Sequence, residues 1–117
     1  MNKPKIENRQ LKNDFLDEHI FVGLKNLNDG FDTESIKYFS ESDFRIVLER
    51  VEKFGLGIYG IEPWQNGTYY DVYGFEDYAK TPTDSRWYNT AFDDFIASGE
   101  ELLYTATYHM PKYDDQL

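Results

Sequence analysis

The fold is decided by residues 40–73, which read SESDFRIVLERVEKFG followed by LGIYGIEPWQNGTYYDVY. In the first part, Ser40 is a suitable N-cap with Asp43 three residues further on, and Gly55 suits the left-handed residue that ends many helices. Between them, apolar residues fall at the spacing of one helix face: Phe44, Val47, Leu48, Val51 and Phe54. These signals predict a helix over residues 40–55.

The second part predicts a β-hairpin. Residues 56–64 are rich in β-branched and aromatic side chains, and Asn66 and Gly67 form a typical hairpin turn before a second such run. We therefore expect residues near 57–63 to pair with residues near 68–74. Gly57 and Gly60 indicate a bulge or a close approach, and we expect both to lie under a crossing helix.

A second helix and a third strand are predicted after a polar loop at residues 74–83. Thr81 or Thr83 can cap this helix, Pro82 suits its first turn, and Gly99 can stop it. Its apolar stripe consists of Trp87, Tyr88, Ala91, Phe92, Phe95 and Ile96. Alternation over residues 102–109 then predicts a strand, which Pro111 ends.

The first 39 residues are less regular. A helix closed by a turn at residues 28–30 is compatible with the spacing of Leu16, Ile20, Leu24 and Leu27. Residues 20–22 could equally begin a strand. A short helical turn after Asp32 would carry Ile36 and Phe39.

The order of these elements predicts an α+β fold, in which a small antiparallel sheet has helices packed on one face and a tyrosine-rich opposite face. The chain has 117 residues, of which 18% are aromatic, enough to bury one core. It contains no repeat or long linker. We therefore expect a single domain over residues 1–117, with residues 1–7 as a loose tail.

Charge and composition exclude several classes of function. The formal net charge is −10, and residues 70–117 contribute −7 of it, from ten acids and three bases. Such a surface repels nucleic acid and anionic membranes, and it either favours a basic protein partner or serves only to keep the chain in solution. The absence of cysteine removes disulfides and thiolate chemistry. Because no apolar run approaches the roughly 18 residues of a membrane span, we expect a cytoplasmic protein.

No catalytic, metal or cofactor motif stands out. His19 and His109 lack metal-ligand spacing, although two distant histidines could still meet as an acid–base pair. Residues 26–34 resemble a calcium loop faintly, but Lys25 stands where the first acidic ligand belongs, which favours a plain turn. Phosphate-binding glycine loops and a serine nucleophile elbow are also missing from the sequence. The sequence therefore predicts a protein without enzymatic activity, metal or cofactor.

Tyrosines on the predicted strands could stack on single-stranded nucleic acid, but few basic residues accompany them. We instead expect them to pair across strands with their hydroxyls at the rim of the sheet. These tyrosines are Tyr59, Tyr69, Tyr73, Tyr104 and Tyr108.

The feature that remains is a set of aromatic residues among carboxylates. Tyr and Trp are favoured anchors of protein interfaces, and carboxylates pair with the Arg and Lys of a basic partner. The predicted partner-binding residues are Trp64, Tyr69, Tyr70, Tyr73, Phe75, Glu76, Asp77, Tyr78, Asp84, Asp93 and Asp94.

In size, charge, the helix-then-hairpin order of residues 44–73 and the Tyr, Asp and Glu content of residues 69–78, the chain resembles small acidic immunity proteins. Bacteria use these proteins to neutralise their own toxins, including those of contact-dependent growth inhibition. The resemblance implies a cytoplasmic, non-catalytic inhibitor that covers the active site of a cognate toxin, often a basic nuclease. Two alternatives are a small enzyme that uses His or carboxylate acid–base chemistry and a homo-oligomeric structural or adaptor protein.

Overall fold

The computed structural model describes residues 5–66 and 68–114. Along the chain come α1 (Lys5–Phe15), a π-helical turn η1 (Leu16–Ile20), α2 (Glu41–Lys53), β1 (Gly57–Gln65), β2 (Thr68–Tyr69), β3 (Tyr73–Gly74), a 3-10 turn η2 (Phe75–Asp77), α3 (Ser85–Ala97), β4 (Leu103–His109) and α4 (Pro111–Asp114). The predicted α+β fold is confirmed. Across these described residues, no helix combines the length and apolarity that a membrane crossing requires.

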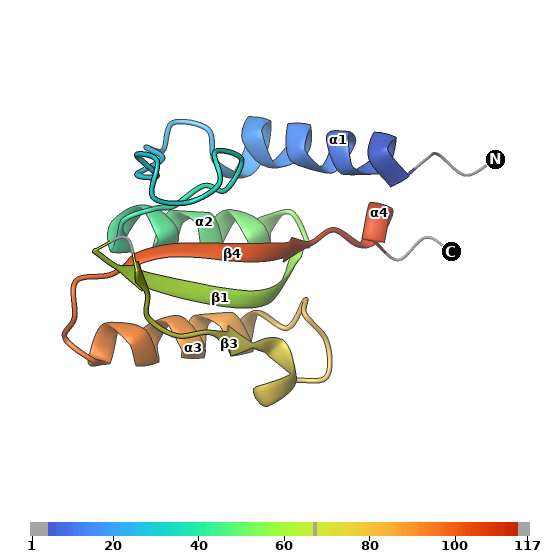
Figure 1. Cartoon of the computed structure of the whole chain (residues 1–117). Helices are drawn as coiled ribbons and strands as arrows, with labels where there is room; N and C mark the ends of the chain where they lie inside the picture. The colour runs from blue at the N-terminus through green and yellow to red at the C-terminus, as the bar shows by residue number, and fades with distance from the viewer. Residues whose placement is uncertain (1–4, 67, 115–117) are drawn as a thin grey trace.

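β1 is the central strand of an antiparallel sheet (Figure 1). β4 pairs with one edge of β1, and β2 and β3 pair with successive parts of the other edge. The predicted hairpin is therefore confirmed, although its second arm is interrupted at residues 70–72 between β2 and β3. The pairing of β1 with β4 shifts between Ile58 and Gly60, which is the bulge that the strand glycines indicated.

α2 and α3 pack on one face of this sheet, as predicted. The N-cap of α2 is Ser40, whose Oγ accepts the Asp43 N–H at 3.3 Å. Gly55 follows the helix with φ of +70°, in the left-handed region. α2 contributes four fully buried side chains to the core: Phe44, Val47, Leu48 and Val51. The strongest sequence signal thus gives the helix that anchors the core.

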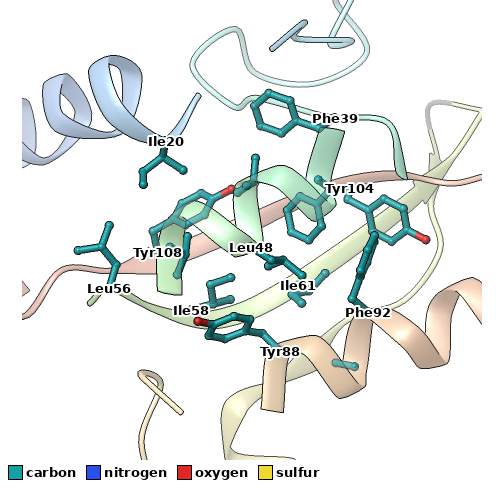
Figure 2. Packing of buried hydrophobic residues seen from close by; sticks show 14 of the residues in the cluster. Ile20, Phe39, Leu48, Leu56, Ile58, Ile61, Tyr88, Phe92, Tyr104 and Tyr108 are labelled. Atoms are coloured by element: carbon teal, nitrogen blue, oxygen red, sulfur yellow. The ribbon is translucent and has the colours of Figure 1, made fainter. Parts of the chain in front are cut away.

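The strand tyrosines differ from the expectation of a tyrosine-rich outer face. Tyr104 is 1% exposed and Tyr108 7% exposed, and both point into the core beneath the helices (Figure 2). Tyr73 also packs on the helical side, with its ring 4.3 Å from that of Phe95. The expectation was wrong for these three residues because alternation shows which side chains share a face and leaves open which face is covered.

The strand glycines do not lie under a helix. Gly57 lies directly against the backbone of Pro82 and Thr83, in the loop before α3, and Gly60 faces Tyr73 of β3. The close approach was predicted correctly, but its partners are a loop and a neighbouring strand.

The N-cap of α3 is Asp84, not Thr81 or Thr83 as expected. An Asp84 carboxylate oxygen accepts the Arg86 N–H at 3.0 Å. The two threonine hydroxyls instead hydrogen bond to each other at 2.9 Å.

The N-terminal segment differs most from its prediction. α1 begins at Lys5, so residues 5–7 are helical and not a loose tail, while residues 1–4 lie outside the described part of the chain. The helical segment ends at Ile20, which leaves Leu24 and Leu27 in a loop. Its end is fixed by tertiary contacts, since the Arg50 guanidinium donates to the carbonyls of Ile20 (3.0 Å) and Val22 (2.7 Å).

Two contacts tie the N-terminal third to the C-terminal strand and helix. The Lys12 ammonium forms an ion pair with the Asp114 carboxylate at 2.9 Å, which joins α1 to α4. Phe39 forms an isolated antiparallel bridge with Tyr104 of β4. The helical turn expected after Asp32 is instead a single hydrogen-bonded turn, in which the Ile36 N–H donates to the Thr33 carbonyl at 2.9 Å.

Stability is expected to fall as the pH rises above about 10, because buried phenols must stay neutral in the fold. Burial, with nearby carboxylates second, raises the pKa of Tyr88 and Tyr104 to about 12, against 10.0 ordinarily. Their stabilising contribution is therefore complete below about pH 10 and is lost as the pH rises toward 12. Urea unfolding followed by circular dichroism should show a lower midpoint at about pH 11 than at about pH 9. In Tyr88→Phe this decline should be shallower, and an equally steep decline would contradict the assignment.

Candidate protein-binding surface

One edge of the sheet carries three exposed large apolar side chains. Tyr70 is 40% exposed, Val72 46% and Tyr78 38%. They belong to the segment that leaves β2, passes through β3 and enters η2, and Figure 1 shows β3 leading into η2 beside α3. Single exposed apolar residues are common, and three on one short segment make this edge the candidate binding surface.

Contacts around Tyr78 bring residues of β3, η2 and α3 together. The Tyr78 hydroxyl donates to Asp94 of α3 at 3.4 Å, and the Tyr78 ring lies 5.8 Å from the ring of Tyr73. Burial of the phenol, followed by the Asp94 carboxylate, raises the pKa of Tyr78 to about 12. The hydroxyl therefore stays protonated near neutral pH and can donate to Asp94.

We define the edge patch as Tyr70, Val72, Tyr73, Phe75, Glu76, Asp77, Tyr78 and Asp94. Its carboxylates at Glu76, Asp77 and Asp94 are exposed, and no ion pair within the described residues involves them. Tyr73 and Phe75 are half-buried, and the ring of Tyr73 lies 5.8 Å from that of Tyr78 while the ring of Phe75 lies 6.2 Å from that of Tyr59. The edge patch thus combines fixed aromatic rings with uncompensated negative charge.

Two of the predicted acids are engaged within the molecule. Asp84 caps α3 and pairs with the Arg86 guanidinium at 2.9 Å, and these bonds hold the pKa of Asp84 below its ordinary value. Asp93 pairs with Arg45 of α2 at 3.2 Å. The structure therefore does not bring Asp84 and Asp93 into the uncompensated acidic surface.

Trp64 of β1 and Tyr69 of β2 occupy paired positions at the hairpin end of the sheet. Trp64 is half-buried at the end of β1, where its ring lies 5.7 Å from that of Phe31 and 5.5 Å from that of Tyr38. The backbone of Tyr69 pairs with Trp64, and the side chain of Tyr69 lies outside the described residues.

Val72 is a surface residue that the sequence did not single out. The sequence signal available for Val72 was its position between Tyr70 and Tyr73 in the predicted second strand of the hairpin.

The two histidines have different surroundings. His109 is 5% exposed at the end of β4, with its ring 5.2 Å from that of Tyr59. His19 is exposed on η1 and packs against Phe15 and Phe54. Within residues 5–66 and 68–114, no three acidic or histidine side chains are grouped so that they could hold a metal ion.

Residues 26–34 form a turn and not a cation loop. The Asn28 side-chain amide donates to the carbonyls of Asp32 (3.3 Å), Thr33 (2.9 Å) and Ile36 (2.9 Å). Its oxygen accepts the Gly30 N–H at 3.1 Å. The side-chain oxygen that could have faced a cation is directed to the backbone.

No protein-family model, curated protein sequence or solved structure matches this chain. The resemblance to immunity proteins therefore stays a prediction.

Proposed function

We propose that this chain is a non-catalytic, acidic inhibitor that binds a basic protein, and that it is an immunity protein which neutralises a cognate bacterial toxin by covering its active site. The observation that supports the proposal best is the edge patch, where exposed rings adjoin carboxylates without ion-pair partners in the described chain.

The aromatic residues of the edge patch suit the centre of an interface. Tyr70 and Tyr78 offer large apolar area with few rotatable bonds, so their ordering on binding costs little entropy. Tyr78 is already held by Asp94 and Tyr73 before any partner arrives. Preorganisation of this kind raises affinity because less freedom remains to be lost.

The carboxylates supply the selectivity. Glu76 and Asp77 project from a short turn, and Asp94 lies beside Tyr78 on the adjacent helix. A toxin that cleaves nucleic acid needs a cationic surface to bind phosphates. Acidic side chains placed on that surface would occupy the phosphate positions and accelerate association through long-range attraction.

The proposal predicts that the reading frame immediately upstream of this chain's gene encodes a large secreted protein, and the test uses the C-terminal domain of that protein as the partner. Co-expression of the chain is expected to restore growth, and the purified pair should form a 1:1 complex that weakens as salt is added. Asp77→Lys should raise the dissociation constant about 10-fold or more, since it replaces an attraction with a repulsion. Calorimetry at two salt concentrations measures both effects.

The matched control is Asp17→Lys, which makes the same change in charge at an exposed position on η1. It should leave the dissociation constant within about 2-fold of the unmodified chain, because only weak long-range attraction changes. Failure to protect cells, or equal weakening by both charge reversals, would argue against the proposal.

A further inference from the structure

A hollow of about 710 Å³ lies where the loop after η1, the end of β1 and the start of β4 meet. We call it the Trp64 pocket, and it is lined by Leu27, Asp29, Phe31, Trp64, Gln65, Asn66, Glu100, Glu101 and Leu103. Apart from Trp64, none of these residues belongs to the predicted interface. The pocket lies at the hairpin end of the sheet, on the side of β1 where β4 pairs.

The wall of the Trp64 pocket is aromatic and firmly supported. The rings of Phe31 and Trp64 lie 5.7 Å apart, and Tyr38 contacts both, at 4.7 Å from Phe31 and 5.5 Å from Trp64. Tyr38 is fully buried, so it forms the base of this three-ring cluster. Its hydroxyl donates to Asp32 at 2.5 Å, which fixes the ring in place.

The loop that carries Asp29 and Phe31 is also fixed. Asn28 directly precedes Asp29 in the chain. Its side chain hydrogen bonds to five backbone groups of residues 30–36. The Leu27 N–H donates to the Tyr38 carbonyl at 2.8 Å, which joins the start of the loop to its end. The pocket therefore exists before a ligand binds.

The rim of the pocket is acidic. Asp29, Glu100 and Glu101 are exposed, and no ion pair within the described chain involves any of them. The Gln65 amide donates to the Glu100 carboxylate at 2.8 Å, but a neutral amide leaves the negative charge uncompensated. The described residues that line the pocket include no Lys, Arg or His.

We propose that the Trp64 pocket binds the guanidinium group of an arginine side chain. A cation is attracted to aromatic ring faces and to carboxylates, and the pocket offers both within one concave site. A guanidinium is flat and weakly hydrated, so it can stack on the rings while its N–H groups reach the carboxylates in a bidentate manner. A lysine ammonium is a compact, strongly hydrated charge and matches a flat aromatic wall less well.

This inference rests on the proposed function and deepens it, because it names the residue type that a basic partner would insert at the hairpin end of the sheet. Its test is independent of the partner. The probe is N-acetyl-arginine methylamide, titrated into the full ¹⁵N-labelled chain and followed by NMR. The indole signal of Trp64 and the amide signals of Phe31 and Glu101 are expected to shift saturably, with millimolar affinity. Trp87 is 2% exposed, so its indole signal should stay fixed and report an intact core.

Two related probes test the chemistry. The citrulline analogue has nearly the shape of arginine without its charge and should give no saturable shift. The lysine analogue should bind at least about 3-fold more weakly than arginine. Equal shifts with citrulline and arginine, or arginine-induced shifts confined to residues outside the pocket, would overturn the proposal.

Variants localise the site. Glu100→Gln combined with Glu101→Gln should weaken arginine binding at least about 5-fold, because two attractive charges are removed. The matched control combines Asp17→Asn with Glu18→Gln, two exposed neighbours on η1, and should leave binding unchanged. Equal weakening in both double variants would show only a general charge effect and would overturn the proposal.

A toxin complex that tolerates the Glu100 and Glu101 changes would refute the pocket's role while leaving the proposed function intact.

Discussion

Replacing Phe44 with alanine is expected to lower the free energy of unfolding by about 4 kcal/mol, the largest effect of any single change considered. Phe44 is 0% exposed and lies where α2, α3 and the sheet meet. Its ring stacks on Tyr104 at 5.4 Å with an angle of 15° and meets the edge of Phe92 at 5.4 Å. Alanine would remove these contacts and leave a cavity among three elements that cannot all collapse into it.

Urea unfolding monitored by circular dichroism measures this loss. Phe54→Ala is the matched control, since it makes the same chemical change at the end of the same helix, where the side chain is 40% exposed. Within the described residues, the Phe54 ring contacts the rings of Phe15 and His19 near the surface, so the expected loss is about 1 kcal/mol. Equal losses in the two variants would show that the aromatic centre is not the main support of the fold.

Gly57→Ala is expected to cost about 3 kcal/mol, although it adds one methyl group. A Cβ at this position would lie 2.6 Å from the Pro82 oxygen and 2.9 Å from the Thr83 nitrogen. Both are backbone atoms, and the Pro82 carbonyl is held by the Ile58 N–H at 3.0 Å and by the Trp87 indole N–H at 3.3 Å. The loop cannot withdraw without losing these hydrogen bonds.

Gly60→Ala serves as the control for Gly57→Ala. The nearest atom to a Cβ at Gly60 is the Tyr73 oxygen at 3.5 Å, which is an ordinary contact. Thermal unfolding should therefore show a small change for Gly60→Ala and a large fall in Tm for Gly57→Ala. Similar Tm values for both variants would mean that the loop before α3 yields easily.

The parts of the fold that the sequence predicted are those with local signals. The α2 cap at Ser40 and the hairpin turn after β1 depend on residues a few positions apart. The end of the first helical segment was missed because it depends on Arg50, 30 residues away from the Ile20 carbonyl that it binds. The α3 cap was missed by one or a few residues, because Thr81, Thr83 and Asp84 are all capable of capping.

The candidate surface was predicted in part for the same reason. Residues 70–78 are contiguous, so their aromatic and acidic character was visible in the sequence. The Trp64 pocket was not predicted, because Phe31, Trp64 and Glu101 lie more than 30 positions apart and meet only in the fold. The adjacent acids Glu100 and Glu101 were visible, but nothing local placed them beside an aromatic wall.

The ion pair between Lys12 and Asp114 links residues 102 positions apart. It joins α1 to α4, and a contact over so long a separation must close a long loop of chain, which costs conformational entropy. Local elements repay their ordering cost sooner than such a long-range pair, so we expect the pair to form after them, and contacts absent from the folding transition state act mainly on the rate of unfolding. We therefore expect the ion pair between α1 and α4 to slow unfolding more than it speeds folding.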